Sequence, residues 1–385
     1  MNIAYCITDP FPAERVSSIQ IAHTVNELAN QGATVHLFTP ATAHKGEIER
    51  HFDLMLSPRL QFHTQHPPTE LRYKHKFSSF SYRCWLLKKL WGMSRRGEID
   101  FIYTRLVKIA SFLQIWASTA GFRIVYEAHN LERDWTYDSY VRAWKNNRRE
   151  RRIFNRQLAG MVCISGTLLN KLKTSYPLKC PTTLIPCGVQ RKFLADGVKL
   201  RPKIGRIRYV GSLSSLEGVD VLMRAMTWIE ATLDIFTRSR PTPALKEMVT
   251  TLGLQKKVRF CGPLDHGQVP HELRQADCLV IPLPGENPVS MGSSPLKLFE
   301  YMASGKPIVA SDVPGVKEIL QDRRNAILFR ASDPQSLAQA VLVLQSDTRL
   351  AHRIAVNALA DAQRYTWDER ARSILRFLEG IRPGS

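Results

Sequence analysis

The 385-residue sequence predicts an α/β protein made of two doubly wound domains, each built on a parallel sheet. The chain is longer than one hydrophobic core usually organises, and its 44% hydrophobic and 23% charged residues are typical of a globular protein. Short apolar runs alternate with segments of helical period, which is the pattern of repeated β-α-β units. In such sheets ligands bind at the carboxyl ends of the strands, so functional side chains are expected there.

The first set of elements begins at residue 2. Residues 2–7 are a short apolar run suited to a buried parallel strand. Apolar residues at helical spacing over 19–29 predict a helix that Gly32 ends, and 35–39 is the next strand. The same alternation continues through strands at 101–103, 124–127 and 184–186.

A second set of elements follows a basic stretch that contains Pro202 and Gly205. We expect its strands at 207–210, 233–236, 258–260, 278–281 and 307–310. Helices over 219–226 and 296–302 occupy two of the intervals. The domain boundary therefore falls near 188–204, and two similar domains that face each other across a cleft are the expected architecture.

The charge balance predicts an anionic partner. The chain has 54 Lys and Arg against 34 Asp and Glu, a net charge of +20. Basic residues outnumber acidic ones by 26 to 14 up to residue 190 and by 28 to 20 after it, so both halves are basic. Such an excess attracts nucleic acid, anionic lipid or phosphorylated substrates.

Several absences in the sequence narrow the class of protein. No run of about 18 apolar residues predicts a transmembrane span, and the first residues lack the basic and apolar regions of a secretory signal. The seven cysteines form no CxxC pair, which argues against a disulfide framework and against a structural zinc site. We therefore expect a cytoplasmic protein without a bound metal.

Residues 293–307 carry the strongest local signal for a ligand. Ser294 is suited to cap a helix and Pro295 to occupy its first position. The first turn then presents free N–H groups and a positive dipole end to an anion. Lys297 lies in that turn, and Glu300 shares its helix face, where a carboxylate can accept paired hydroxyls such as those of ribose. The alternative is an ordinary capped helix with an exposed Lys–Glu pair.

The sequence resembles a known enzyme family in five segments that occur in order. These are VGSL at 210–213, GVDVL at 218–222, FCG at 260–262, ADCLVIP at 276–282 and SPLKLFEYMASGKPIVA at 294–310. Together they look like the carboxyl-terminal half of retaining glycosyltransferases of family 4, the glycosyl transferases group 1, which have the two-domain GT-B fold. The YEAHN run at 126–130 resembles a loop of the family's acceptor domain, LIPCGV at 184–189 resembles the segment that joins the domains, and YTW at 365–367 resembles the start of the closing segment.

This resemblance implies an acceptor-binding domain at 1–188, a nucleotide-sugar-binding domain at 189–364, and a terminal helix at 365–385 that packs back on the first domain. The implied reaction moves a sugar from a UDP- or GDP-linked donor to an acceptor sugar, lipid-linked sugar or polysaccharide precursor. The anomeric configuration is kept, and no metal or other cofactor is needed. Helix N-termini, Lys and Arg would stabilise the charge that develops on the leaving diphosphate. A nucleotide-sugar epimerase or phosphorylase of similar architecture is the rival enzyme, which product analysis would separate.

The resemblance also assigns roles to residues. Glu300 matches a glutamate on the donor ribose and His129 a histidine near the transferred sugar, and these two are the expected catalytic residues. The alternative for His129 is a satisfied histidine at a strand end, and Glu127 either orients it or pairs with a local arginine. The other expected donor contacts are Gly211, Ser212, Gly262, Ser294, Pro295, Leu296 and Lys297. In a loop where the family is often Gly-rich and this chain is not, the expected contacts are Arg15, Ser17 and Ser18.

Three positions depart from the family pattern. Gly292 stands where the family has the first glutamate of a pair, unless Glu286 supplies that contact from a different loop geometry. Ser212 stands where an arginine is common and Glu217 where a lysine is common, so an acid would repel the diphosphate. Two arginines that follow the 233–236 strand are candidates to restore the charge, or else form a solvated basic loop: Arg238 and Arg240. A degenerate, weakly active or partner-dependent enzyme therefore stays open.

A basic and aromatic segment, 72–96, predicts contact with an anionic membrane surface. It carries eight Lys or Arg and no acid, interleaved with aromatic and leucine residues. The cations that flank its apolar face are Lys88, Lys89, Arg95 and Arg96. This pattern is typical of an interfacial helix, and a lipid-linked acceptor would need such contact. The alternative is that this segment and 142–156, which adds seven basic residues, form amphipathic helices that cover the sheet, with Trp85 and Leu86 buried.

A nucleic-acid-binding protein is the non-enzyme alternative, because of the net charge of +20 and the aromatic residues among the basic ones. No zinc-ligand spacing, RNP-like run or Gly-x-x-Gly clamp supports it, and a phosphorylated substrate explains the charge. We therefore expect no specific nucleic acid. Nanomolar, steeply salt-dependent binding to DNA would favour this alternative.

Overall fold

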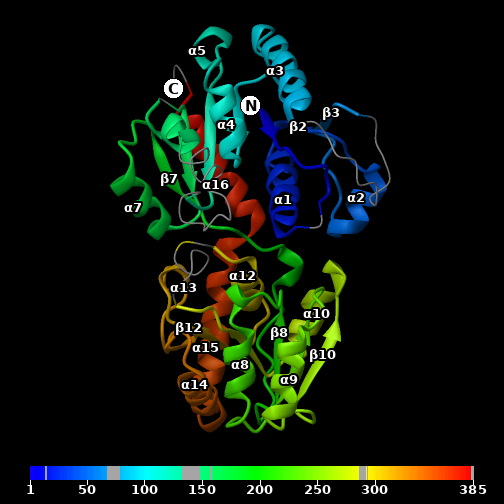
Figure 1. Ribbon diagram of the computed structural model, residues 1–385, viewed down its shortest axis with the longest axis vertical. Helices are drawn as coiled ribbons and strands as arrows, with labels where there is room; N and C mark the ends of the chain where they lie inside the picture. Colours follow the sequence, from blue (N-terminus) through cyan, green and yellow to red (C-terminus); the bar gives the residue numbers. More distant parts are fainter. Residues whose placement is uncertain are drawn as a thin grey trace. The chain divides into compact units, whose positions relative to one another are not determined.

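The computed structural model describes residues 1–13, 15–66, 79–131, 148–156, 158–285, 292 and 294–382. They form two compact units, whose elements are labelled in Figure 1. The first unit joins Met1–Pro186 to Trp367–Ser385, and the second is Cys187–Thr366. The boundaries expected from the sequence, 188/189 and 364/365, differ from these by two residues.

The first unit is built on a parallel sheet of seven strands in the order β3-β2-β1-β4-β5-β6-β7. The strands are β1 (Asn2–Cys6), β2 (Thr34–Thr39), β3 (Leu60–Thr64), β4 (Phe101–Thr104), β5 (Ile124–Ala128), β6 (Gly160–Cys163) and β7 (Thr182–Leu184). The strand order reverses between β1 and β4. The crevice outside the carboxyl ends of these two strands is therefore where a doubly wound sheet binds its ligand.

Helices cover this sheet, and one of them comes from the far end of the chain. The helices are α1 (Val16–Asn30), α2 (Lys45–Phe52), α3 (Ser79–Arg95), α4 (Val107–Leu113), α5 (Ala117–Ala120), α7 (Gly166–Ser175) and α16 (Trp367–Gly380). Helix α16 lies beside α1 (Figure 1) and buries Ala371, Ile374 and Leu378 in the core of the first unit. The first unit is therefore completed by residues that follow the whole of the second.

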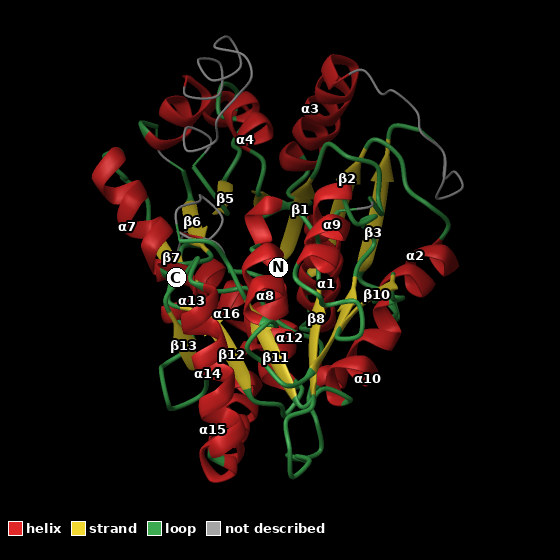
Figure 2. Cartoon of the chain, turned by 60° about the horizontal axis from the view of Figure 1, so that its bottom comes forward, coloured by secondary structure: helices red, strands yellow, loops and turns green. Residues whose placement is uncertain are grey.

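The second unit is a parallel sheet of six strands in the order β10-β9-β8-β11-β12-β13, drawn in yellow among red helices in Figure 2. Its strands are β8 (Arg206–Val210), β9 (Thr232–Phe236), β10 (Val258–Gly262), β11 (Cys278–Ile281), β12 (Ile308–Ser311) and β13 (Ile327–Phe329). Its helices are α8 (Val219–Ala225), α9 (Pro243–Thr251), α10 (Val269–Arg274), α12 (Leu296–Ala303), α13 (Pro314–Lys317), α14 (Pro334–Ser346) and α15 (Thr348–Ala362). Here the order reverses between β8 and β11, which predicts a second ligand site at their carboxyl ends.

The fold class expected from the sequence, doubly wound parallel α/β, is confirmed in both units. Three strands were not predicted: β3, β6 and β13. The edge strand β3 carries polar residues at three of its five positions, β6 begins with a glycine, and β13 has only three residues. Each of these features weakens the local strand signal, so pairing with neighbouring strands defines these three strands.

Helix α3 is the described part of the basic and aromatic segment, since residues 72–78 lie outside the described residues. Its apolar stripe faces the protein interior, with Tyr82, Leu86 and Leu90 buried and Trp85 half-buried. The expected apolar face for a membrane is therefore wrong for this helix, which covers the sheet as the alternative proposed. Its exposed cations are Lys88, Lys89 and Arg95, and the adjacent Arg96 pairs with Glu98. Of the second basic segment, residues 142–147 also lie outside the described part.

Candidate functional site

In the second unit, Gly211 lies directly after β8, at the point where the strand order reverses. A side chain here would have no room, because a Cβ on Gly211 would lie 2.8 Å from the Tyr209 hydroxyl and 2.9 Å from Lys297 Nζ. Glycine at this position therefore lets the Lys297 ammonium pass directly over the backbone at the end of β8.

The ammonium of Lys297 is held by two neighbours. It forms an ion pair with the Glu217 carboxylate and donates a hydrogen bond to the Tyr209 hydroxyl at 3.0 Å. It also lies 4.6 Å from the centroid of the Tyr209 ring. The side chains of Lys297 and Glu217 are only 11% and 21% exposed, so this is not the exposed Lys297–Glu300 pair given as an alternative from the sequence.

The turn that carries Glu217 is fixed by a glycine. Glu217 ends the short 3₁₀ helix Ser215–Glu217, and Gly218 follows with φ of +67°. A Cβ on Gly218 would lie 1.8 Å from the Pro282 carbonyl oxygen, a clash with backbone that no other residue could avoid. This turn packs against the end of β11 and therefore positions Glu217 beside Lys297.

Helix α12 begins without a side-chain cap. Pro295 is its N-cap residue, and the expected cap, Ser294, instead accepts a hydrogen bond from the Cys187 backbone N–H at 3.1 Å. The expected positions of Ser294 and Pro295 in the helix are therefore wrong by one residue. Leu296 and Lys297 open the first turn, where uncapped N–H groups and the helix dipole attract an anion.

Glu300 lies one turn into α12 and has no hydrogen-bond or ion-pair partner within the described ranges. Glu300 is half-buried, and the loss of water around its carboxylate raises its pKa to about 7, although Lys297 opposes the shift. A carboxylate removed from water normally has hydrogen-bond donors. The Glu300 carboxylate can therefore accept hydrogen bonds from a ligand.

The other residues expected at the donor are spread over neighbouring strand ends. Gly262, with φ of +78°, ends β10, and its carbonyl accepts from the Thr237 N–H at 2.8 Å. Ser212 accepts from the Ser214 N–H at 3.0 Å. The remaining pair, Arg238 and Arg240, is exposed and makes no ion pair with any described residue. Glu286 lies outside the described residues.

In the first unit, Glu127 is the centre of a buried polar cluster at the end of β5. Its carboxylate lies 2.6 Å from His129 Nε2 and 3.0 Å from an Arg370 nitrogen, and it accepts a hydrogen bond from Gln20 at 3.0 Å. The Tyr103 hydroxyl also donates to it. Burial pushes the pKa of Glu127 up, but Arg370 and the hydrogen bonds from His129 and Tyr103 bring it well below its usual value. Glu127 is therefore an ionised, fully partnered carboxylate.

His129 is the residue of this cluster that can still bind a ligand. Burial lowers its pKa to about 4, and the nearby positive charge of Arg105 acts in the same direction. The imidazole is therefore neutral at pH 7, and the contact with Glu127 assigns its hydrogen to Nε2. Nδ1 has no hydrogen-bond partner in the described part of the chain, which leaves it free to accept from a hydroxyl.

The loop residues expected near the phosphates form contacts within their own unit. The Arg15 guanidinium lies 3.3 Å from Asp9 at the surface. Ser18 is buried and accepts from the Ala13 N–H at 2.9 Å, which holds the loop to the start of α1, and Ser17 is half-buried. Four residues around Glu127 and His129 were not predicted from the sequence: Gln20, Tyr103, Arg105 and Arg370. Tyr103 ends the predicted strand 101–103 and Arg105 lies two residues after it, so these two have a local signal, whereas Gln20 and Arg370 have none.

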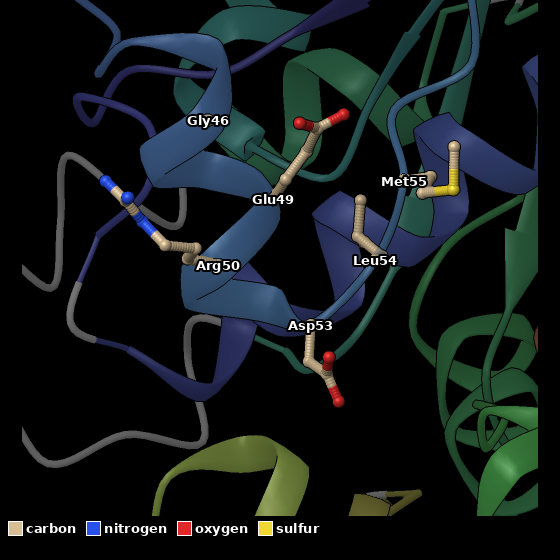
Figure 3. Close-up of a pocket in the computed structure, with 6 residues that line it drawn as sticks. All are labelled: Gly46, Glu49, Arg50, Asp53, Leu54 and Met55. Atoms are coloured by element: carbon tan, nitrogen blue, oxygen red, sulfur yellow. The ribbon is translucent and has the colours of Figure 1, made fainter.

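A hollow of about 510 Å³ lies elsewhere on the first unit, at the end of α2 (Figure 3). Its lining is Gly46, Glu49, Arg50, Asp53, Leu54 and Met55. Glu49 already accepts a hydrogen bond from the Leu56 N–H at 3.0 Å. The hollow contains none of the residues expected at a site.

Comparison with known proteins agrees with the geometry of both units. A family model described as Glycosyltransferase Family 4 matches residues 17–193, and one described as Glycosyl transferases group 1 matches residues 205–347. The chain belongs to glycosyltransferase family 4. The expected family is thereby confirmed. In this family-4 glycosyltransferase the first match ends seven residues inside the second unit, and the second match lies wholly within that unit.

Curated relatives of this family-4 glycosyltransferase match over part of their length. The D-inositol 3-phosphate glycosyltransferase of Jonesia denitrificans is 29% identical over 205 residues, which are 50% of this chain and 47% of that protein. The phosphatidyl-myo-inositol mannosyltransferase of Mycobacterium leprae is 28% identical over 203 residues, 51% of this chain and 53% of that protein. The chain thus matches about half the length of these relatives.

Solved structures share the fold over the whole chain. Sucrose-phosphate synthase from Thermosynechococcus elongatus has a TM-score of 0.76 at 19% identity and covers 99% of this chain and 98% of its own. HepE from Anabaena, in complex with UDP and glucose, has a TM-score of 0.73 at 18% identity and covers 99% and 100%. These likenesses identify the GT-B fold. No helix in the described residues is long and apolar enough to cross a membrane.

Proposed function

We propose that this chain is a retaining glycosyltransferase that takes a sugar from a nucleoside diphosphate donor and needs no metal ion. The observation that carries the proposal is the Glu300 carboxylate, which is half-buried, has no partner within the described ranges and lies one turn from the uncapped start of α12. Two adjacent ribose hydroxyls would supply the hydrogen bonds that this carboxylate lacks.

The start of α12 supports binding of the diphosphate next to that ribose. Its free N–H groups and dipole attract an anion, and Lys297 stands in the same turn. On donor binding the Lys297 ammonium would exchange Glu217 for a phosphate oxygen. These groups would stabilise the negative charge that develops on the leaving diphosphate, which is the main task of such a catalyst.

The polar cluster of the first unit supports a role with the transferred sugar and the acceptor. His129 would accept a sugar hydroxyl through Nδ1, while Glu127 fixes the ring through Nε2. Glu127 is therefore a positioning residue, since its own oxygens are occupied by protein donors. The acceptor we propose is a sugar or a lipid-linked sugar.

The structures of HepE with UDP, and with UDP and glucose, support a uridine nucleotide as the donor. The groups proposed to bind the donor would contact its ribose and phosphates, which GDP-linked donors share. Thermal-shift measurements with UDP, GDP and their sugars test the donor, because a ligand that binds the folded chain raises its melting temperature. NMR analysis of the anomeric configuration of the product then tests retention, and a product that is merely an epimer of the donor would identify the rival enzyme.

We also propose that the first unit contacts an anionic membrane at the periphery, through the exposed cations of α3. Phe80 on the same helix is 69% exposed. Trp116, after α4, is 37% exposed and lies 6.0 Å from the Trp91 ring, and its neighbour Ile115 is 47% exposed. Exposed aromatic residues beside Lys and Arg are suited to the headgroup region of a bilayer.

A further inference from the structure

Arg105 is a half-buried arginine at the point where the strand order of the first sheet reverses. It directly follows β4, and its Nη1 donates to Gln20 Oε1 at 2.5 Å. No carboxylate pairs with it in the described part of the chain. The neighbouring arginines differ in this respect, because Arg15 pairs with Asp9 and Arg370 with Glu127.

Gln20 ties Arg105 to the cluster around His129. The Gln20 side chain is buried; its amide nitrogen donates to Glu127 at 3.0 Å and lies 3.2 Å from His129 Nε2, while its oxygen accepts from Arg105. All the polar atoms of this amide are therefore committed within the cluster. Arg105 is held in place by a fixed acceptor, and it follows β4 just as His129 follows the neighbouring strand β5.

The charges of this cluster do not balance. Glu127 and Arg370 cancel, and His129 is neutral at pH 7. Tyr103 stays protonated because burial raises its pKa. Arg105 is left as one uncompensated positive charge, partly removed from water, at the crevice where a doubly wound sheet binds its ligand. An arginine in this setting is suited to a phosphate or carboxylate, which its planar fork can bind through two hydrogen bonds.

We propose that the acceptor of this enzyme carries a phosphate or carboxylate group, and that Arg105 binds this group while an acceptor hydroxyl lies near His129. The inference rests on the proposed function and adds the chemical class of the acceptor. It makes Arg105 a specificity-determining residue: a neutral sugar would leave the guanidinium without its counter-charge.

The test compares charged and neutral probes of the same shape. Calorimetric titrations of the full chain at 0.15 M salt use myo-inositol 1-phosphate against myo-inositol, and glucuronate against glucose, so that the two pairs distinguish phosphate from carboxylate. For at least one pair the wild type is expected to bind the charged probe roughly tenfold to a hundredfold more tightly, as a charge-assisted hydrogen bond provides. Arg105→Gln should reduce this ratio to near one. Lys108→Gln, at an exposed position three residues away, should leave it unchanged.

Arg105→Lys gives a second measurement should Arg105→Gln not fold. It keeps the charge but not the planar fork, so the preference for the charged probe should fall severalfold. Equal binding of charged and neutral probes by the wild type, or a full preference in both Arg105 variants, would overturn the inference. UDP binding is measured in every variant and should not change. Failure of the wild type to bind UDP would count against the donor proposal. Normal UDP binding, with a preference for the charged probe that does not depend on Arg105, would count against this inference.

Discussion

Lys297 and Glu217 form an ion pair over Gly211, although 80 positions separate them in the sequence. Glu217 therefore acts as an internal counter-ion at the place where the donor phosphates are proposed to bind. From the sequence, Glu217 was expected to repel a diphosphate. In the structure it neutralises Lys297, the cation that would attract one. A donor must replace Glu217 to reach Lys297, so affinity for the donor is reduced by the strength of this pair.

Glu217→Gln should therefore increase affinity for UDP. The pair is largely shielded from water, and releasing Lys297 from it should gain about 1–2 kcal/mol, roughly tenfold in Kd. Isothermal titration measures the gain, which should be larger for UDP than for UMP. Glu230→Gln is the matched control, since Glu230 also pairs with a lysine, at 3.0 Å, but at the surface. An unchanged or weaker affinity for UDP would mean that Glu217 does not compete with the phosphates.

Glu300→Gln should abolish transfer and yet stabilise the fold at alkaline pH. Burial raises the pKa of Glu300 from 4.5 to about 7, so the protonated carboxyl favours the folded state. That stabilisation is fully present below pH 4.5 and is lost as the pH rises through 7. The variant should therefore gain stability relative to wild type between pH 5 and pH 8, by on the order of 1–3 kcal/mol.

Melting temperatures of both proteins across this range measure the effect of Glu300. Glu247→Gln, an exposed change on α9, is the control and should follow wild type at every pH. Parallel curves for Glu300→Gln and wild type would show that the carboxyl is not perturbed. Wild-type turnover in the variant would remove Glu300 from the donor site.

Arg370→Met should destabilise the protein severely. It would leave the ionised Glu127 buried without its cation, which typically costs about 3–5 kcal/mol. Arg372→Met on the same helix is the matched control: Arg372 is 41% exposed and pairs with Asp368, so its loss should cost less than about 1 kcal/mol. Urea unfolding compares the two, and similar midpoints would contradict the buried pair.

The pH dependence of that pair has a defined sign. The pKa of Glu127 lies well below its usual value in the folded state, so the carboxylate stabilises the fold above pH 4.5. This contribution is lost as the pH falls below 4.5 towards the folded pKa. Adding Glu127→Gln to Arg370→Met should recover part of the lost stability, because no buried charge then remains.

Arg238→Ala combined with Arg240→Ala tests whether these exposed arginines replace the missing cations at the donor. The double change should weaken binding of UDP more than binding of UMP, since the second phosphate supplies the extra charge. Arg349→Ala with Arg353→Ala, exposed on α15, makes the same change in net charge and should not alter the ratio. An equal loss for UDP and UMP would leave the basic loop without a role in phosphate binding.

Changing Lys88, Lys89, Arg95 and Arg96 to Gln should release the protein from vesicles that contain anionic lipid. Arg96 is already paired with Glu98, so three cations count, and at about 1 kcal/mol each they account for roughly a hundredfold in partitioning. Co-sedimentation at low salt measures this, and added salt should mimic the variant. The control variant removes three exposed charges from the second unit and should have little effect on partitioning. It changes these residues to Gln: Lys246, Lys256 and Arg349. Failure of the wild type to co-sediment would end the membrane proposal.

Much of the fold could be predicted because its signals are local. The strand at 278–281 and the helix at 296–302 can each be recognised from fewer than ten residues. The observed β11 and α12 have the same bounds to within one residue. What could not be predicted depends on neighbours in space. Strand β6 begins with a glycine, a residue that weakens a strand, and its pairing with β5 and β7 is what defines it.

The same distinction applies to the candidate site. Lys297 and Glu300 drew attention through their spacing in one helix, but nothing nearby in the sequence indicates that Glu217 is the partner of Lys297. Gln20 and Glu127 are 107 positions apart, and Arg370 comes from a helix beyond the second unit. Such contacts have no period, so they become visible only when the chain is folded.

The place of α16 has a consequence for synthesis of the protein. Residues 1–186 leave the ribosome first, with the Glu127 carboxylate in their interior but without Arg370, the cation that neutralises it. About 180 further residues must be translated before that helix appears, which at 5–20 residues per second is roughly ten to forty seconds. The nascent first unit therefore cannot reach its final state during its own translation. The apolar residues that α16 covers in the folded protein stay exposed until that helix has been translated.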